Sequence, residues 1–376
     1  MKKSFFALAS ALIFTLVTIV ACSDDDSDTM PGDGNDGDDI VDPSFNRGEL
    51  LEDLASNLIL PNFESLQASV SAMSVATDNF VENTTEENLV ALRSAWIQAV
   101  TDHQHCSAFG FGPASLNLGP YASVLGVFPV DQAQVETNII DSDFNLAASF
   151  DRDVRGFYAV EYLIYGVGNS DAQLVAFFDN ARKDYLQLIV NELKTTFDDI
   201  VGEWQASYLQ EFINDDGTSA GSSISLLYNE FVQDYENLKN FKVELPAGLT
   251  AGQVEADPTL VEAFYSGISR DLIEEHFESS KNIWSGTTRN GQDIIGFDDY
   301  LNSVVGGPEL VATTEIALAS IDGAIGNLPE GRLSDQIDAS EVTVLRDELQ
   351  SNTANFKSSM SSLLGISITF NSGDGD

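Results

Sequence analysis

The chain has 376 residues, of which 60 are acidic and 17 are basic, giving a formal net charge of −43 at pH 7. So negative a surface repels phosphate backbones, and the composition excludes nucleic acid as a partner. Hydrophobic residues still make up 43% of the sequence. The part after residue 43 can therefore bury one large core or two of moderate size.

The first 21 residues predict a lipoprotein signal peptide. Lys2 and Lys3 precede an apolar run that ends in Ile-Val-Ala-Cys at 19–22, which resembles a bacterial lipobox. The run is short for a membrane-spanning helix and normal for a signal peptide. We expect cleavage before Cys22, lipidation of Cys22 and attachment to a membrane through the lipid. An ordinary signal peptide or a membrane anchor helix is the alternative. With Cys22 lipidated, Cys106 has no intrachain partner for a disulfide.

Residues 22–43 form a stretch rich in Asp and Gly, which has little to bury and repels itself. We expect a disordered acidic tether there. Acidic residues directly after a lipidated Cys resemble the export signal of Bacteroidota lipoproteins. That resemblance implies an outer-membrane lipoprotein facing the periplasm or the cell surface. Asp33, Asn35 and Asp38 offer calcium binding as an alternative, but the stretch lacks the full loop spacing and a closing Glu.

Apolar residues at helical spacing dominate the rest of the chain. A break at 214–217 (Asn-Asp-Asp-Gly) divides it in two. We predict an all-α fold of two antiparallel four-helix-bundle-like halves, 44–213 and 218–370. The Gly- and Pro-rich stretch 110–130 predicts an irregular loop beside a functional site, and Thr84 is the predicted N-cap of the third helix. In chain order, the expected helices cover residues 47–59, 61–81, 85–109, 131–138, 150–166, 172–212, 224–241, 260–284, 308–325 and 340–364.

One face of the helix expected at 150–166 carries an unusual set of polar groups. Tyr158, Glu161 and Tyr165 are three and four residues apart, so they share that face. Their neighbours are apolar, and we expect this face to turn inward toward a cavity. A carboxylate buried there needs a cation, a metal or several hydrogen-bond donors. The three residues are therefore candidate metal-binding or ligand-binding residues.

The same segment resembles the signature of the imelysin family, Gly-x-His-x-x-Glu. Gly156 and Glu161 match it, and Tyr158 stands where the family has His. Four further segments resemble landmarks of that family in the expected order. They are Leu92–Trp96, Phe109–Pro113 with its Gly112 and Pro113, Phe128–Asp131, and Glu262–Ser266 with its Tyr265 and Ser266.

The resemblance implies a two-bundle helical fold that is exported across the inner membrane. It also implies a link to iron acquisition or to metallopeptidase activity. In the family, the signature His and Glu are regarded as a metal-ligand pair, which implies that Tyr158 and Glu161 stand at the corresponding site.

The residue types at this site bear on which metal it would prefer. Phenolate and carboxylate oxygens are hard ligands that suit ferric iron better than zinc, so iron is the expected cofactor. The chain has three histidines and no His-Glu-x-x-His, so the pattern does not favour zinc or an active zinc peptidase. His103 and Cys106, with His105 between them, form a second candidate ligand group. The alternative is that they are ordinary helix-end residues, with Cys106 filling the core.

Positive charges are scarce, so the partner of Glu161 can be narrowed down. If no metal neutralises this carboxylate, Arg93 or Arg155 is the expected charge partner, because both lie near the family landmarks. Arg152, a tyrosine hydroxyl or backbone N–H groups are the alternatives.

These patterns favour an exported lipoprotein that binds a metal, iron above all, or a small ligand in connection with iron uptake. One alternative is a degenerate or inactive metallopeptidase of the imelysin type. Another is a non-catalytic interaction module for an outer-membrane transporter. The incomplete set of zinc ligands argues against an enzyme.

Overall fold

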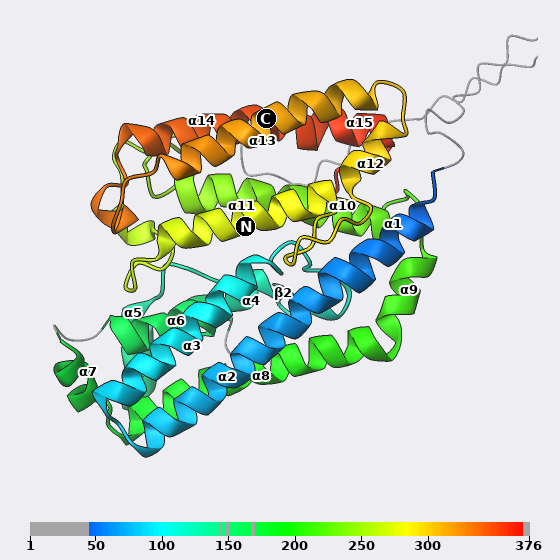
Figure 1. The fold of residues 1–376 in the computed structure, drawn as a ribbon. Helices are drawn as coiled ribbons and strands as arrows, with labels where there is room; N and C mark the ends of the chain where they lie inside the picture. The colour runs from blue at the N-terminus through cyan, green and yellow to red at the C-terminus, as the bar shows by residue number, and fades with distance from the viewer. Residues whose placement is uncertain (1–44, 143–144, 147–149, 167–169, 371–376) are drawn as a thin grey trace, which may run out of the picture. The chain divides into compact units, whose positions relative to one another are not determined.

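The computed structural model describes residues 45–142, 145–146, 150–166 and 170–370 (Figure 1). The predicted signal peptide (1–21), the acidic tether with its calcium alternative (22–43) and the lipidation of Cys22 all lie outside the described residues.

The predicted all-α fold is confirmed. Among the described residues, the only paired strands are a short antiparallel hairpin of β1 (Ser115–Leu116) and β2 (Gly119–Pro120), in the stretch predicted to be an irregular loop. No described helix has the length and apolarity needed to cross a membrane. The α-helices are α1 (Arg47–Leu54), α2 (Leu60–Glu82), α3 (Glu86–Gln104), α4 (Ala122–Leu125), α5 (Gln132–Asp141), α6 (Gly156–Tyr165), α7 (Asp171–Phe177), α8 (Asn180–Glu203), α9 (Leu209–Asn214), α10 (Ser223–Asn237), α11 (Ser269–Ser285), α12 (Phe297–Asn302), α13 (Gly307–Gly326), α14 (Ser340–Ala354) and α15 (Ser361–Leu364).

Two groups of helices form the described part of the chain (Figure 1). In the first, α2 packs along both α3 and α8, and α6 packs against α8 and α3. In the second, α13 packs along α14, and α11 contacts α10, α12 and α13. The groups meet where α11 contacts α3 and where α1 contacts α10. The division into separate domains at 44–213 and 218–370 remains a prediction.

One of the expected helices is divided and another begins later than predicted, and each difference has an identifiable cause. The predicted helix 172–212 is divided at Asp179, whose side chain accepts a hydrogen bond from the Arg182 N–H (3.0 Å) and so caps α8. The predicted helix 260–284 begins only at Ser269, because the residues before it form an irregular loop. In that loop Ala263 has a positive φ of 51°, which a helix does not allow.

The N-cap of α3 is Thr85, so the prediction of Thr84 is wrong by one residue. Thr85 has an extended backbone, and its hydroxyl accepts a hydrogen bond from the Asn88 N–H at 3.2 Å. The Thr84 hydroxyl instead donates to the Phe80 carbonyl at the end of α2.

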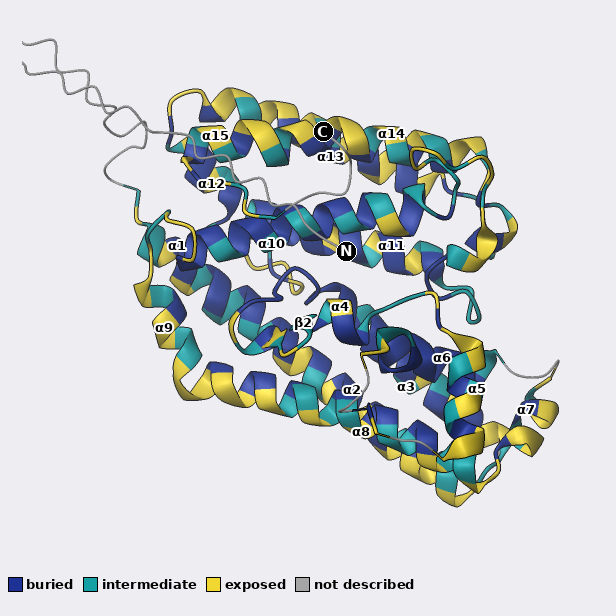
Figure 2. Cartoon of the chain, turned by 180° about the vertical axis from the view of Figure 1, so that it is seen from behind, coloured by how far each residue is buried: buried dark blue, intermediate teal, exposed yellow. Residues whose placement is uncertain are grey.

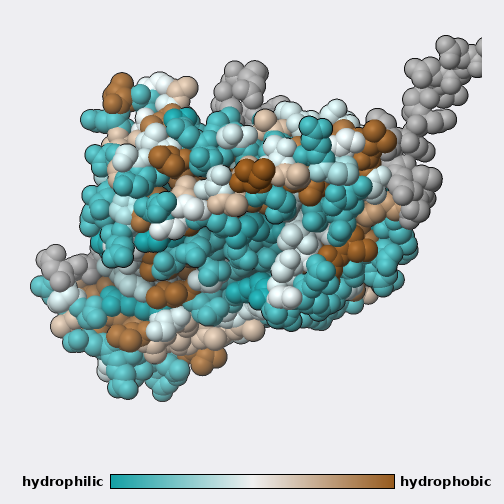
Figure 3. Space-filling view, turned by 45° about the horizontal axis from the view of Figure 1, so that its top comes forward, coloured by the Kyte–Doolittle hydropathy of each residue, from teal (hydrophilic) through white to brown (hydrophobic). Residues whose placement is uncertain are grey.

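The signature helix α6 lies in the interior. Each residue from Gly156 to Ile164 is buried, whereas long helices such as α8 and α13 expose much of their surface, as the dark blue and yellow in Figure 2 indicate. The Trp96 indole on α3 donates to the Phe157 carbonyl at 2.8 Å and fixes α6 against α3. Figure 3 shows mainly hydrophilic side chains on the face drawn there, as expected for so acidic a chain.

Two glycines of the predicted motifs are required by close packing. Gly156 has φ = +74°, and a Cβ there would lie 1.9 Å from the Leu125 carbonyl oxygen. Gly112 has φ = +53°, and a Cβ would lie 2.1 Å from the Tyr208 ring. Both positions favour glycine for its left-handed backbone and for the missing side chain. Pro113 follows within a 3-10 turn, Gly112–Ala114.

Candidate functional site

A pocket of about 290 Å³ lies beside α6. One wall comes from Phe128–Val130. The other comes from residues 259–266, hereafter called the wall loop, which lead into α11. Its base carries Tyr158 and Glu161. The lining residues are Phe128, Pro129, Val130, Gln132, Tyr158, Glu161, Thr259, Val261, Ala263, Phe264 and Tyr265.

Glu161 is almost completely buried, with 1% of its surface exposed. Its Oε1 accepts hydrogen bonds from the Ser266 N–H at 2.7 Å and from the Ser266 hydroxyl at 2.8 Å. Burial raises the pKa of the carboxyl to about 7, although the Ser266 donors act in the opposite direction. Glu161 is therefore a carboxyl group that gains and loses its proton near neutral pH.

The hydroxyl of Tyr158 belongs to a second cluster of buried polar groups, next to the pocket. Its hydroxyl donates to Glu262 Oε1. The Lys242 ammonium lies 3.0 Å from the same oxygen, and the Gln104 amide donates to it at 3.3 Å. Lys242 also donates to the Gln104 side-chain oxygen. Burial, followed by the Glu262 charge, raises the pKa of Tyr158 well above its usual value, so the phenol keeps its proton.

The expected charge partners of Glu161 are bonded elsewhere. Arg93 pairs with Asp171 at 2.8 Å and donates to the Ile164 carbonyl. Arg155 pairs with Glu192 at 2.8 Å. The prediction that Arg93 or Arg155 neutralises Glu161 is wrong, because each of them pairs with another carboxylate. The backbone donor named among the alternatives is present at Ser266, together with its hydroxyl.

Tyr165 does not share the pocket with Tyr158 and Glu161. Its ring packs edge-on against Trp96, with centroids 5.6 Å apart, and the Arg93 guanidinium lies 4.5 Å above it. One turn further along α6, this side chain therefore packs against α3 and does not line the pocket. The cavity expected for three polar residues contains two of them.

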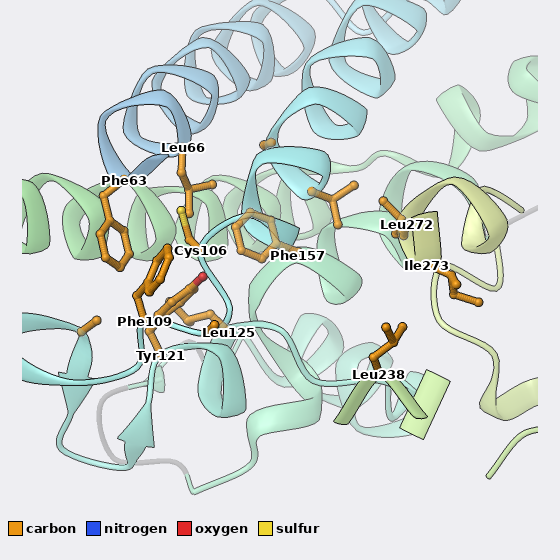
Figure 4. Packing of buried hydrophobic residues seen from close by; sticks show 14 of the residues in the cluster. Phe63, Leu66, Cys106, Phe109, Tyr121, Leu125, Phe157, Leu238, Leu272 and Ile273 are labelled. Atoms are coloured by element: carbon orange, nitrogen blue, oxygen red, sulfur yellow. The ribbon is translucent and has the colours of Figure 1, made fainter. Parts of the chain in front are cut away.

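The second candidate ligand group lies in the core. His103 stacks on Phe157, and its Nδ1 is 3.1 Å from the Tyr121 hydroxyl. Burial, followed by the Lys242 and His276 charges, lowers the pKa of His103 to about 3. Cys106 lies among apolar side chains (Figure 4), and burial raises its thiol pKa. His105 Nε2 pairs with Glu275 at 2.7 Å. Neither His103 nor Cys106 lines the pocket.

The described polar groups at the pocket do not form a metal-binding set. Within the described ranges, no three His, Cys, Asp or Glu side chains come together in a way that could hold a metal ion. The Tyr158 proton is committed to Glu262, and the Lys242 ammonium already supplies positive charge there. Tyr158 and Glu161 therefore do not fit a ferric ion held by protein ligands alone, because hard cations require several anionic oxygens.

The wall loop is held in place from two sides. Ser269 donates to the Glu262 carbonyl. Arg332 donates to the carbonyls of Phe264 and Tyr265, the latter at 3.2 Å. Ala263 keeps its positive φ between these contacts. Non-glycine residues in this conformation persist where the surrounding structure imposes it, often at functional sites.

Sequence reasoning missed Glu262, Lys242, Gln104 and Arg332 as parts of the site. Glu262 had a visible signal, since it opens the predicted motif segment Glu262–Ser266 in a largely apolar stretch. The other three belong to distant parts of the chain, and nothing in the local sequence around them distinguishes them from surface residues.

The substitution Glu161→Gln tests the buried carboxyl through its pH dependence. The folded pKa of about 7 exceeds the unfolded value of 4.5. As pH rises from about 4.5 to about 7, the unfolded chain therefore ionises first, and the unfolding free energy falls. We expect Glu161→Gln to lack that fall and to be more stable than wild type above pH 7, by about 3 kcal/mol.

Urea unfolding of both proteins at several pH values measures this difference. Other carboxyls, such as Glu230, also have a raised pKa and contribute to the pH dependence of both proteins. The effect of Glu161 is therefore the difference in unfolding free energy between the two proteins at each pH. A variant less stable than wild type at pH 8 would mean that Glu161 has a cationic partner in the folded protein.

The fold and the pocket together define an all-α protein with a protonatable carboxyl at the base of an aromatic-walled cavity. The sequence model of the imelysin family (Peptidase_M75) matches residues 59–360, well over half of the chain. The chain therefore belongs to the imelysin family.

Two of the similar proteins carry iron-related names. The iron-regulated protein A of Synechococcus elongatus is 19% identical over 247 residues, and the match spans 65% of each chain, just under two thirds of that relative. A crystal structure described as an iron-regulated protein A precursor from Parabacteroides distasonis has a TM-score of 0.71 at 17% identity, covering 84% of this chain and 95% of that one. An imelysin-like protein from Psychrobacter arcticum gives 0.68 at 19% identity, covering 86% and 97%. At these identities the structures show a shared fold.

Proposed function

We propose that this chain is an exported lipoprotein that binds a small ligand in the pocket above Tyr158 and Glu161. One observation carries the proposal. Glu161 is buried at the base of an aromatic-walled pocket, and among the described residues no Arg, Lys or His pairs with it. A buried carboxylate without a counter-charge is costly to keep unless it serves a ligand.

A connection with iron uptake is part of this proposal. It is supported by family membership and by the names of the iron-regulated relatives. Because the pocket lacks a set of protein ligands for iron alone, the ligand that we propose is a small molecule rather than a bare ion. Lipidation of Cys22, an outer-membrane location and delivery of the ligand to a membrane transporter are the accompanying proposals.

Ligand binding is better supported than hydrolysis. A metallopeptidase needs about three protein ligands for its metal and a base that activates water. The part of the chain that the structure describes brings no such ligand group together. Cleavage of a denatured insulin chain, with and without added zinc, measures the alternative, and we expect no cleavage in either case.

The proposal is tested by asking what the purified protein retains. We expect native mass spectrometry of the full chain, purified from membranes without chelator, to show a bound small molecule at one per chain. Thr259→Trp places an indole at the exposed rim of the pocket and should abolish retention. Val254→Trp is the matched control, because Val254 is 96% exposed and does not line the pocket.

Two results would contradict the proposal. One is a protein that retains nothing and takes up nothing from an extract of its own cells. The other is equal retention by both variants, which would place the ligand elsewhere. Elemental analysis of the same samples shows whether iron accompanies the molecule, and iron without any small molecule would favour direct metal binding.

A further inference from the structure

Two buried carboxylates, Glu161 and Glu262, lie at or near the pocket, and only one of them has a cation beside it. Glu262 has the Lys242 ammonium 3.0 Å from its Oε1, with further donors from Tyr158 and Gln104. Glu161 has donors from Ser266, but no Arg, Lys or His among the described residues forms an ion pair with it. The site therefore holds one internal cation for two acidic groups, and the acidic group without a cation is the one that lines the pocket.

The walls of the pocket suit a positive charge as well. Four aromatic rings line it, and two pairs of them pack edge to face. Phe128 and Tyr158 have centroids 5.2 Å apart, and those of Phe264 and Tyr265 are 5.3 Å apart. The negative faces of such rings attract cations. The remaining lining is apolar or neutral, apart from Glu161 itself.

We propose that the pocket binds a small organic cation, a protonated amine with a short apolar group. Its ammonium lies against Glu161 and the aromatic faces beside it, including that of Phe264, and its apolar part fills the rest of the pocket. This inference rests on the proposed function, since it names the ligand class of the same pocket.

A metal ion fits these surroundings less well than an organic cation. An ammonium group is satisfied by one carboxylate, nearby aromatic faces and a few hydrogen-bond acceptors. A hard metal ion needs several anionic oxygens, and the Tyr158 hydroxyl is committed to Glu262. The volume of about 290 Å³ leaves room for an apolar group, which a bare ion would leave unfilled.

The proposal predicts how binding depends on pH. Glu161 is neutral in acid and ionises as pH rises through about 7, while an alkylamine stays protonated up to about pH 10. Affinity for an organic cation should therefore increase between pH 6 and pH 8. A neutral or anionic ligand gains nothing from this ionisation.

Titration calorimetry of the full chain with three probes of similar size tests the proposal. The probes are phenethylammonium, phenethyl alcohol and phenylacetate. We expect phenethylammonium to bind at pH 8, the alcohol to bind at least tenfold more weakly, and phenylacetate not to bind. Glu161→Gln should weaken phenethylammonium binding by about 10- to 100-fold, as for the loss of a hydrogen-bonded charge.

Two further variants guard against a general effect of substitution. Glu309→Gln removes an exposed carboxylate on α13 and should leave the affinity unchanged. Phe264→Leu keeps an apolar wall but removes a ring, and should weaken the ammonium by about three- to tenfold more than it weakens the alcohol.

Several outcomes would overturn the proposal while leaving the proposed function intact. One is a retained native ligand that is neutral or anionic. Another is binding of the alcohol as tight as that of the ammonium, with no response to Glu161→Gln. No binding of phenethylammonium at millimolar concentration would also overturn it. Glu161-dependent uptake of ferric ion or zinc without ammonium binding would assign the site to a metal. If the protein retains no ligand of any kind, the proposed function fails with it.

Discussion

Lys242→Met is expected to lower the unfolding free energy by about 3 to 5 kcal/mol, because it leaves a carboxylate buried without its cation. Lys242 and Glu262 are both buried, and their charged atoms lie 3.0 Å apart. Met has a similar length and fills the same space, so the loss reports the charge and not a cavity. Urea unfolding at pH 7 measures the effect.

Two controls accompany this substitution. Lys281→Met removes a lysine that pairs with Glu278 and Asp322 nearer the surface, and we expect it to cost less than about 1 kcal/mol. The double variant with Lys242→Met and Glu262→Gln removes both charges and should recover much of the lost stability. If the single variant unfolds at the same urea concentration as wild type, Lys242 does not compensate the charge of Glu262.

Gly156→Ala should lower the stability by about 3 to 5 kcal/mol, from a strained backbone and from overlap. Gly156 has φ = +74°, and the new Cβ would lie 1.9 Å from the Leu125 carbonyl oxygen. That contact is to backbone, so no side chain can rotate away from it. Because Gly156 begins α6, the shift needed to relieve it also moves Tyr158 and Glu161, and ligand retention should fall.

Gly202→Ala is the matched control for this substitution. Gly202 lies within α8, and nothing approaches within 4 Å of the position that its Cβ would take. Alanine there should stabilise the protein by about 0.5 to 1 kcal/mol, because glycine is a poor helix former. If both substitutions change the unfolding free energy by the same amount, the close packing of Gly156 against Leu125 is not the reason for glycine at position 156.

The wall loop is a segment whose structure was predicted wrongly from the spacing of apolar residues. Apolar residues at helical spacing predicted a helix from 260, yet α11 begins at Ser269. The competing interactions are tertiary, since Arg332 takes the carbonyls of Phe264 and Tyr265 from more than 60 residues away. The helical spacing predicted correctly that Glu161 faces inward. It also predicted that Tyr165 shares the cavity with Glu161, which is wrong, because Tyr165 does not line the pocket.

The sequence by itself determined the all-α class, most of the helical segments and the burial of α6, because apolar spacing depends only on neighbours along the chain. It also indicated the family, through short segments that can be read without a structure. The partners of the buried carboxyls were decided by the tertiary structure alone. Glu161 meets Ser266 from 105 residues away, and Tyr158 meets Glu262 from 104 residues away. A hydrogen bond forms only within about 3 Å, and packing of distant segments sets which donors come that close.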